Sequence, residues 1–290
     1  MPAIEVQGLE KSFGKFRAVR GVSFTIREGS VAGFVGPNGA GKTTTIKSMA
    51  TLVRPDRGSI KLLGKDPFKD KGVFREVSFV FSKLSYPPTD TVKEYLEDMA
   101  SVFGGDVAKV VEEFGLKPHL GKKLGELSSG LAQRIQLAGA LIKEPKLIIA
   151  DEPTANLDPT ARNEFYDLVR ELNSRGVTFL ISSHILSELE RVIDYAVFIS
   201  EGRVTFEGPL AQAMKDEGYV VVLPDDADKA VQVLKGYKVF RQGAYLVVNG
   251  DLREVVNLLE SNGVKVIIAR RSSLDEAYRR YSEAGPEGEV

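Results

Sequence analysis

A glycine-rich segment, GPNGAGKTT at residues 36–44, carries the clearest chemical pattern in the chain. Its fixed positions are Gly36, Gly41, Lys42 and Thr43, and they match the phosphate-binding pattern G-x-x-x-x-G-K-[ST]. Glycines let backbone N–H groups turn toward phosphate oxygens, and a helix beginning near Lys42 directs its positive end at the same anion. The Lys42 ammonium adds charge beside the outer phosphates, and the Thr43 hydroxyl is a ligand for Mg²⁺.

A chance match of this glycine-rich turn is the alternative interpretation. The apolar run before the segment and the helical spacing after it favour a true phosphate loop instead. The residues of this loop that we expect to contact a nucleotide are Gly36, Asn38, Gly39, Gly41, Lys42, Thr43 and Thr44.

Two acids, Asp151 and Glu152, directly follow the short apolar run at residues 147–150. A carboxylate at the end of such a strand is placed to hold the Mg²⁺ shell, and we assign that role to Asp151. Glu152 stands one residue further along and is placed to polarise a water that attacks the γ-phosphate. Alternatively, Asp151 caps the next helix and Glu152 is merely exposed.

The hydrophobic pattern predicts the elements that position these residues. Continuous apolar runs at 31–36, 77–81 and 147–150 are typical of buried parallel strands. They alternate with helical spacing after residue 42 and over 161–176, which indicates a mostly parallel α/β sheet.

Two further segments depart from this alternation. Residues 4–26 alternate apolar with polar side chains, as antiparallel strands with one exposed face do. The period is helical from about 91 to 142, which predicts an inserted helical subdomain. We also expect a helix over ILSELERVI, residues 185–193, and a hairpin that turns at Glu201 and Gly202.

The chain from residue 216 onward reads as a separate unit. Its apolar patterns follow the order βαββαβ, the ferredoxin-like split unit, and a short helix over SLDEAYRRYS follows. We therefore predict a phosphate-binding α/β domain over 1–215 and a small α+β accessory domain over 216–290.

Composition excludes several classes of function. The 290 residues suggest about two domains, and the 39 Lys and Arg nearly cancel the 40 Asp and Glu. Binding to nucleic acid or anionic lipid through an overall positive charge is therefore not expected. Cysteine is absent and only two histidines occur, which excludes a disulfide framework, a Cys-ligated metal centre and a thiol nucleophile. We expect neither a membrane-spanning segment nor a secretory signal, so work at a membrane would require docking on another chain.

Four motifs follow one another along the chain: the phosphate loop, LSSGLAQR at 127–134, LIIADEPTANLD at 147–158 and SSH at 182–184. In order and spacing they resemble the ATPase subunits of ATP-binding cassette (ABC) transporters over residues 4 to 215 or so. The resemblance implies ATP and Mg²⁺ as cofactors and ATP hydrolysis as the activity. It also implies a second ABC ATPase subunit, so that two subunits sandwich two ATP molecules and each phosphate loop faces the signature segment of the other.

The resemblance assigns further site residues. Ser128 and the backbone N–H of Gly130 would touch the partner's γ-phosphate, although Ser128 would cap the following helix in any case. His184 matches the switch histidine that contacts the γ-phosphate, and Asp158 matches the loop that links the two sites. Phe13 corresponds to the aromatic that stacks on adenine, the alternative being a place in the core.

The chain departs from the family pattern at three positions. Ser82 stands where a Gln usually touches the metal, and its shorter hydroxyl would reach Mg²⁺ only through a water. Ser129 replaces a usual Gly and Leu131 a usual Gln in the signature. The phosphate contacts of Ser128 and Gly130 would be retained but weakened.

A second likeness concerns the type of transporter. Residues 182–208 and the terminal helix resemble cassette ATPases of the drug-export and polysaccharide-export type. Such subunits pair with a separate membrane-spanning transporter subunit, so we expect a peripheral protein at the cytoplasmic face of the cell membrane that binds no nucleic acid. The alternative is a soluble ABC-type ATPase acting on nucleic acid, ribosomes or iron–sulfur assembly. A single cassette, no heptad run and a net charge of -1 disfavour it.

Overall fold

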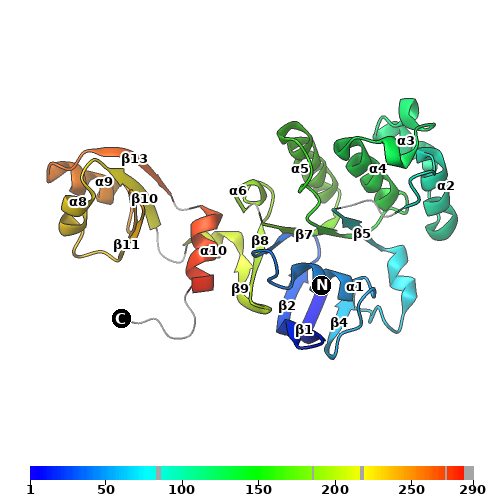
Figure 1. Ribbon diagram of the computed structural model, residues 1–290, viewed down its shortest axis with the longest axis horizontal. Helices are drawn as coiled ribbons and strands as arrows, with labels where there is room; N and C mark the ends of the chain where they lie inside the picture. The colour runs from blue at the N-terminus through cyan, green and yellow to red at the C-terminus, as the bar shows by residue number, and fades with distance from the viewer. Residues whose placement is uncertain (83–85, 185, 216–218, 272, 284–290) are drawn as a thin grey trace. The chain divides into compact units, whose positions relative to one another are not determined.

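The computed structural model describes residues 1–82, 86–184, 186–215, 219–271 and 273–283 (Figure 1). The chain divides into two compact units, Met1–Glu207 and Gly208–Val290. The predicted boundary at 215/216 falls after helix α7 (Leu210–Lys215), whereas the units divide before it. The reason is that α7 packs against helix α10 (Leu274–Glu283) of the second unit.

A six-stranded sheet forms the centre of the first unit, in the order β5-β6-β7-β3-β8-β9. The pairs from β5 through β8 are parallel, and β9 follows β8 through a tight turn at Glu201 and Gly202. Every residue of β3, β6 and β7 is buried, which confirms for β3 and β6 the buried strands expected from the apolar runs at 31–36 and 147–150. The strand expected over 77–81 is β5, in which Phe79 and Phe81 are only partly buried. The strands are β3 (Val31–Val35), β5 (Val77–Phe81), β6 (Leu147–Asp151), β7 (Thr178–Ser183), β8 (Tyr195–Ser200) and β9 (Arg203–Pro209).

A smaller antiparallel sheet carries the N-terminal strands in the order β2-β1-β4. These are β1 (Pro2–Phe13), β2 (Phe16–Arg27) and β4 (Arg57–Leu62). Their inward side chains share one hydrophobic core with the six-stranded sheet, and the rings of Phe24 and Phe34 lie 5.3 Å apart across that junction. The mixture of a mostly parallel sheet with an antiparallel one is the predicted α/β arrangement.

Helices connect and cover these strands. Helix α1 (Lys42–Met49) follows β3, and α5 (Pro159–Ser174) follows β6. The predicted helical insertion comprises α2 (Val92–Phe103), α3 (Val107–Glu113) and α4 (Ser129–Leu141), with short 3₁₀ turns at Lys71–Arg75, Lys117–His119 and Leu124–Glu126. These three helices lie together beside β5 (Figure 1).

The helix expected over 185–193 is shorter than predicted. Residue 185 lies outside the described residues, and α6 covers only Leu186–Leu189. Arg191 N–H to Glu188 O and Val192 N–H to Leu189 O are bonds of the i−3 type that tightens and ends a helix, and one further i−4 bond, from Ile193 N–H to Leu189 O, follows them.

The second unit has its own four-stranded antiparallel sheet in the order β11-β12-β10-β13. Helices α8 and α9 pack on one face around a separate core that includes Val222, Leu246 and Leu259. The element order βαββαβ agrees with the predicted ferredoxin-like unit. Its elements are β10 (Tyr219–Pro224), α8 (Ala227–Val233), β11 (Val239–Gln242), β12 (Tyr245–Asn249), α9 (Leu252–Ser261) and β13 (Val266–Arg271).

Throughout the ranges that the structure describes, no helix has both the length and the apolar character needed to cross a membrane.

Candidate active site

The phosphate loop runs between β3 and α1, as predicted. Two of its glycines are required by close approach of other backbone segments. A Cβ on Gly36 would lie 2.3 Å from Ile199 O, and one on Gly41 would lie 2.6 Å from Ala18 O. Gly41 also has a φ of 105° as the residue that caps α1, a conformation that side chains disfavour.

The turn between β8 and β9 supports this loop from behind. Gly202 N–H donates to Ala40 O at 3.0 Å, while Gly202 O accepts from Arg20 N–H at 2.8 Å. Glu201 and Gly202 both have positive φ, 48° and 78°, as a tight hairpin turn of this type requires. The position of the phosphate loop is thus tied to strands of both sheets of the first unit.

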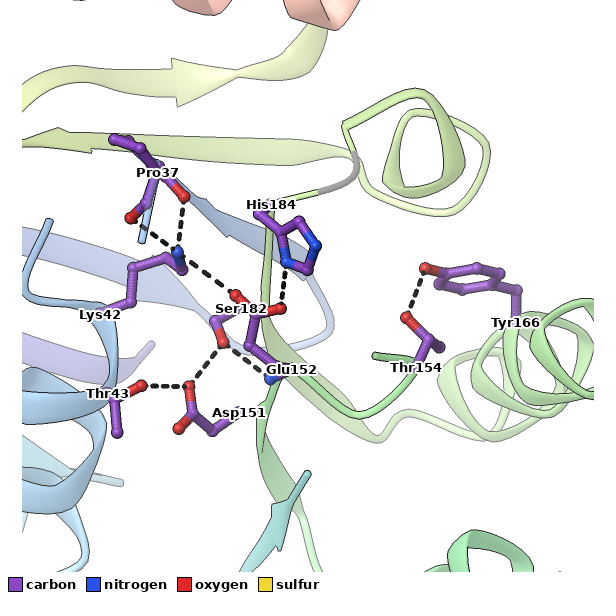
Figure 2. Close-up of polar contacts among 10 residues, drawn as sticks. Pro37, Lys42, Thr43, Asp151, Glu152, Thr154, Tyr166, Ser182 and His184 are labelled. Carbon is purple, nitrogen blue, oxygen red and sulfur yellow. Dashed lines mark hydrogen bonds and ion pairs between the residues drawn. The ribbon is translucent and has the colours of Figure 1, made fainter. Parts of the chain in front are cut away.

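Lys42 lies at the start of α1 with its side chain only 5% exposed. Its ammonium donates to Gly36 O at 2.5 Å and to Pro37 O at 3.1 Å, and it stands 3.3 Å from Glu152 Oε1 (Figure 2). The charge of Lys42 is therefore held between the phosphate loop and the end of β6.

Asp151, the last residue of β6, faces Thr43 across the sheet edge. Asp151 Oδ1 accepts from Thr43 Oγ1 at 3.3 Å and from Ser182 Oγ at 2.8 Å (Figure 2). A hydroxyl beside a carboxylate is the all-oxygen donor set that Mg²⁺ prefers, so these residues fit the ion. Asp151 does not cap the next helix, because Asp158 does so by accepting from Thr160 and Ala161 N–H.

Glu152 links the phosphate loop to His184. Its Oε2 pairs with His184 Nδ1 at 2.5 Å while its Oε1 faces Lys42 (Figure 2). Glu152 has a φ of 50°, which is strained for a non-glycine residue. Ser182 Oγ helps to hold this conformation because it accepts from Glu152 N–H at 2.9 Å. The alternative in which Glu152 is merely exposed does not apply, since its side chain is 16% exposed and paired twice.

A hollow of about 200 Å³ opens at the phosphate loop. Its lining residues are Phe16, Ala18, Pro37, Asn38, Gly39, Gly41, Lys42, Thr43, Thr44 and Glu152. Phe16 is 60% exposed and lines the hollow, whereas Phe13, which is 50% exposed, is not among the lining residues. The core alternative for Phe13 is thus excluded.

Sequence reasoning missed Phe16. Phe13 and Phe16 are paired across the β1–β2 hairpin, so either could have been considered from the sequence once the Gly14–Lys15 turn was recognised. Lys11 Nζ lies 5.5 Å from the ring centroid of Phe13, a cation–π contact on the exposed side of the strand.

The predicted signature and linking residues meet in a second hollow, of about 890 Å³. Ser128 caps α4 by accepting from Leu131 N–H at 3.4 Å, and Asp158 caps α5 at 2.9 and 3.0 Å. Ser128, Gly130 and Asp158 all line this hollow, so two helix N-termini open into it. None of the three lines the hollow at the phosphate loop.

Two of the three departures from the family pattern lie together. Ser82 and Ser129 line a third hollow, of about 400 Å³, with Asn156, which donates from Nδ2 to Ser82 O at 3.3 Å. Ser82 is not among the residues that line the hollow at the phosphate loop. Ser82 thus shares a hollow with Ser129 of the signature and not with the phosphate loop.

Comparison with known proteins agrees with these features. A sequence model described as "ABC transporter" matches residues 19–155, and one described as an AAA domain of a putative AbiEii toxin matches 123–190. The chain is 32% identical to the bacitracin transport ATP-binding protein BcrA of Bacillus licheniformis, over 91% of each chain. It is 39% identical to the Nod factor export ATP-binding protein I of Burkholderia lata, over 71% of this chain and 70% of that one.

Solved structures of ABC transporter ATP-binding subunits are also similar to this chain. A structure described as the ATP-binding subunit of an ABC transporter superposes with a TM-score of 0.68 and 28% identity, over 73% of this chain and 92% of that one. The ADP conformation of MJ1267, an ATP-binding cassette of an ABC transporter, gives 0.65 and 27%, over 73% and 92%.

A phosphate loop at the carboxyl ends of a mostly parallel sheet, with Asp151 and Glu152 at the end of β6, separated from β3 only by β7, defines a nucleotide-binding protein of the P-loop class. With these relatives, the chain belongs to the ATP-binding subunits of ABC transporters.

Proposed function

We propose that this chain hydrolyses ATP to power export through a separate membrane-spanning subunit. The observation that carries the proposal is the row of side chains Lys42, Glu152 and His184 beside the Thr43–Asp151 pair (Figure 2). Relatives named for Nod factor export and bacitracin transport favour this function over a cassette ATPase of nucleic acid, ribosomes or iron–sulfur assembly.

In this proposal each side chain has a distinct task. Lys42 and the loop N–H groups bind the outer phosphates. Glu152 orients the attacking water and accepts its proton, while His184 holds the Glu152 carboxylate and contacts the γ-phosphate. Thr43 and Asp151 would hold Mg²⁺, which neutralises charge on the phosphate oxygens when bound. Ser82 would reach the metal shell only through water.

Adenine binding would use an aromatic ring of the β1–β2 hairpin. The sequence resemblance assigns the stacking to Phe13, whereas the lining of the loop hollow favours Phe16. We keep both residues as candidates, because they are neighbours across the same turn.

A second ABC ATPase subunit would complete the site. Ser128, Gly130 and Asp158 line a hollow different from that of Lys42, which supports a role toward the nucleotide of another subunit. We propose that this pair, homodimeric or heterodimeric, docks peripherally on the membrane subunit at the cytoplasmic face. The ferredoxin-like unit would be an accessory domain to the cassette.

The decisive experiment measures Mg²⁺-dependent phosphate release from ATP by the full chain. We expect Glu152→Gln to retain ATP binding but to lose turnover by ~10²-fold or more, the usual size for a lost general base. The same variant should accumulate as an ATP-bound dimer in size-exclusion chromatography. Lys42→Ala should instead weaken ATP binding itself, as measured by calorimetry.

A matched control is Glu97→Gln on α2, whose exposed carboxylate pairs with Lys93 at 3.6 Å. It should hydrolyse ATP at the wild-type rate. Wild-type turnover in Glu152→Gln would remove Glu152 from the reaction, and no ATP hydrolysis by the wild type alone or with its membrane subunit would refute the proposed activity.

A further inference from the structure

Arg162, in the first turns of α5, joins two loops that are distant in sequence. Its Nε donates to Leu157 O at 2.8 Å, and its Nη1 pairs with Glu188 Oε1 at 2.7 Å. Both side chains are about three-quarters buried, at 25% and 26% exposure. This guanidinium is therefore a specific bridge within the fold, unlike a solvated surface pair.

The first loop that Arg162 holds is the one that would face a second subunit. Leu157 directly precedes Asp158, which caps α5 and lines the larger hollow with Ser128 and Gly130. Leu157 is itself only 6% exposed. A shift of Asp158 would thus move the carbonyl to which Arg162 donates.

The second loop carries the histidine of the site. Glu188 lies in α6, which begins at Leu186, two residues after His184. Glu188 Oε2 is buried and accepts no hydrogen bond from the part of the chain that the structure describes. The Glu188 carboxylate therefore depends on Arg162 to offset most of the free-energy cost of its burial, because a partly buried charge without a partner is costly.

Two more contacts come from the same face of α5, at four-residue spacing. Tyr166 OH lies 3.4 Å from Thr154 Oγ1, two residues after Glu152 (Figure 2). Arg170 Nη2 donates to Arg191 O at 3.3 Å, just beyond α6. One face of α5 thus holds the segments that follow both Glu152 and His184.

We propose that Arg162 is a positioning residue that transmits the docking of a second subunit at Asp158 to the His184–Glu152 pair of the same chain. The inference rests on the proposed function, and it names the route within one subunit. Contact at Asp158 moves the Leu157 carbonyl, Arg162 and Glu188 follow it, and α6 sets the place of His184 against Glu152.

A lysine cannot replace this bridge. A guanidinium donates in two fixed directions at once, whereas an ammonium is a single point charge on a flexible stem. Arg162→Lys should therefore keep the ion pair with Glu188 and the thermal unfolding midpoint, but lose the simultaneous contact with Leu157 O. This variant separates positioning from simple stabilisation.

The experiment compares steady-state ATP hydrolysis by full-length Arg162→Lys, Arg162→Ala and Glu188→Gln. We expect kcat to fall by ~10-fold or more, the scale on which a small misplacement of a reacting group acts. The ATP dissociation constant should stay within about twofold of wild type, and any ATP cooperativity should be lost. Arg162→Ala combined with Glu188→Gln should be no slower than the slower single variant, because residues acting as one unit are not additive.

The control is Arg175→Ala at the other end of α5, which removes exposed pairs with Glu113 and Glu171 and should keep the wild-type kcat. Wild-type kcat and cooperativity in Arg162→Lys would overturn the inference while leaving the ATPase proposal intact. A loss of ATP affinity with kcat unchanged at saturating ATP would overturn it as well. A wild type that hydrolyses no ATP would refute both.

Discussion

The carboxylate of Glu152 is shared between Lys42 and His184: Oε1 lies 3.3 Å from Lys42 Nζ, and Oε2 lies 2.5 Å from His184 Nδ1. One side chain thus connects the cation that would bind phosphate with the imidazole that would contact the γ-phosphate. A phosphate at the loop must compete with Glu152 for the Lys42 ammonium, and its arrival would leave Glu152 paired with His184.

The first prediction concerns this shared carboxylate. His184→Ala should lower kcat by ~10- to 100-fold with little change in ATP affinity, because it removes the support of Glu152 while Lys42 and the phosphate loop still bind ATP. The double variant His184→Ala with Glu152→Gln should be no slower than Glu152→Gln alone, since the two act as a unit. Single-turnover phosphate release measures this. Fully multiplicative effects would show that the two side chains act independently.

The second prediction separates the two aromatic candidates for adenine. Phe16→Ala should raise the ATP dissociation constant by roughly 5- to 150-fold, the equivalent of ~1–3 kcal/mol of base stacking. Phe13→Ala should change it less, because Phe13 does not line the loop hollow. Calorimetry with ATP and GTP gives both values. A larger effect at Phe13 would restore the assignment made from the family resemblance.

The third prediction concerns the two serines that depart from the family pattern. Ser82→Gln should raise basal hydrolysis by roughly two- to tenfold, the range of one gained hydrogen bond worth ~0.5–1.5 kcal/mol. Ser129→Gly should raise it further in a self-paired chain, because it removes a hydroxymethyl near the phosphate contacts of the signature.

Because Ser82 and Ser129 line the same hollow, their effects should also couple. The double variant should therefore depart from the product of the single effects in phosphate-release assays. A double variant no faster than wild type would show that both departures are silent.

The fourth prediction is a pH dependence of stability. Burial lowers the pKa of Lys143 to about 8, although Nζ donates to Phe74 O and Val77 O and lies 4.1 Å from the ring centroid of Phe103. The folded pKa is below that of the unfolded chain, so between about pH 8 and 10.5 the unfolded state binds the additional proton. Lys143 should therefore destabilise the fold fully below pH 8 and progressively less above it.

Urea unfolding of the wild type and of Lys143→Gln at pH 7 and pH 10 measures this effect. The stability of the wild type relative to the variant should rise with pH, since glutamine does not titrate and the other lysines cancel in the comparison. A difference that is constant across this range would show that Lys143 keeps an ordinary pKa.

Local patterns in the sequence were sufficient for the phosphate loop, the Asp151–Glu152 pair and the strand types, because each depends on a short window or a simple period. They were not sufficient for Phe16, whose place follows from its pairing with Phe13 across a hairpin. The Arg162–Glu188 pair joins residues in separate elements, so only tertiary packing brings them together. The end of α6 was also unpredictable, since the helical spacing continues where the backbone changes to i−3 bonds.

The bond from Gly202 N–H to Ala40 O makes the β8–β9 turn a remote reporter of the phosphate loop. Amide hydrogens exchange with solvent only when their bonds open, and the degree of protection measures the free energy of that opening. The amides of Gly202 and Arg20, both outside the loop, should therefore exchange more slowly when a ligand stabilises it. Deuterium uptake at this turn thus measures how strongly a ligand stabilises the phosphate loop, without a probe in the nucleotide site.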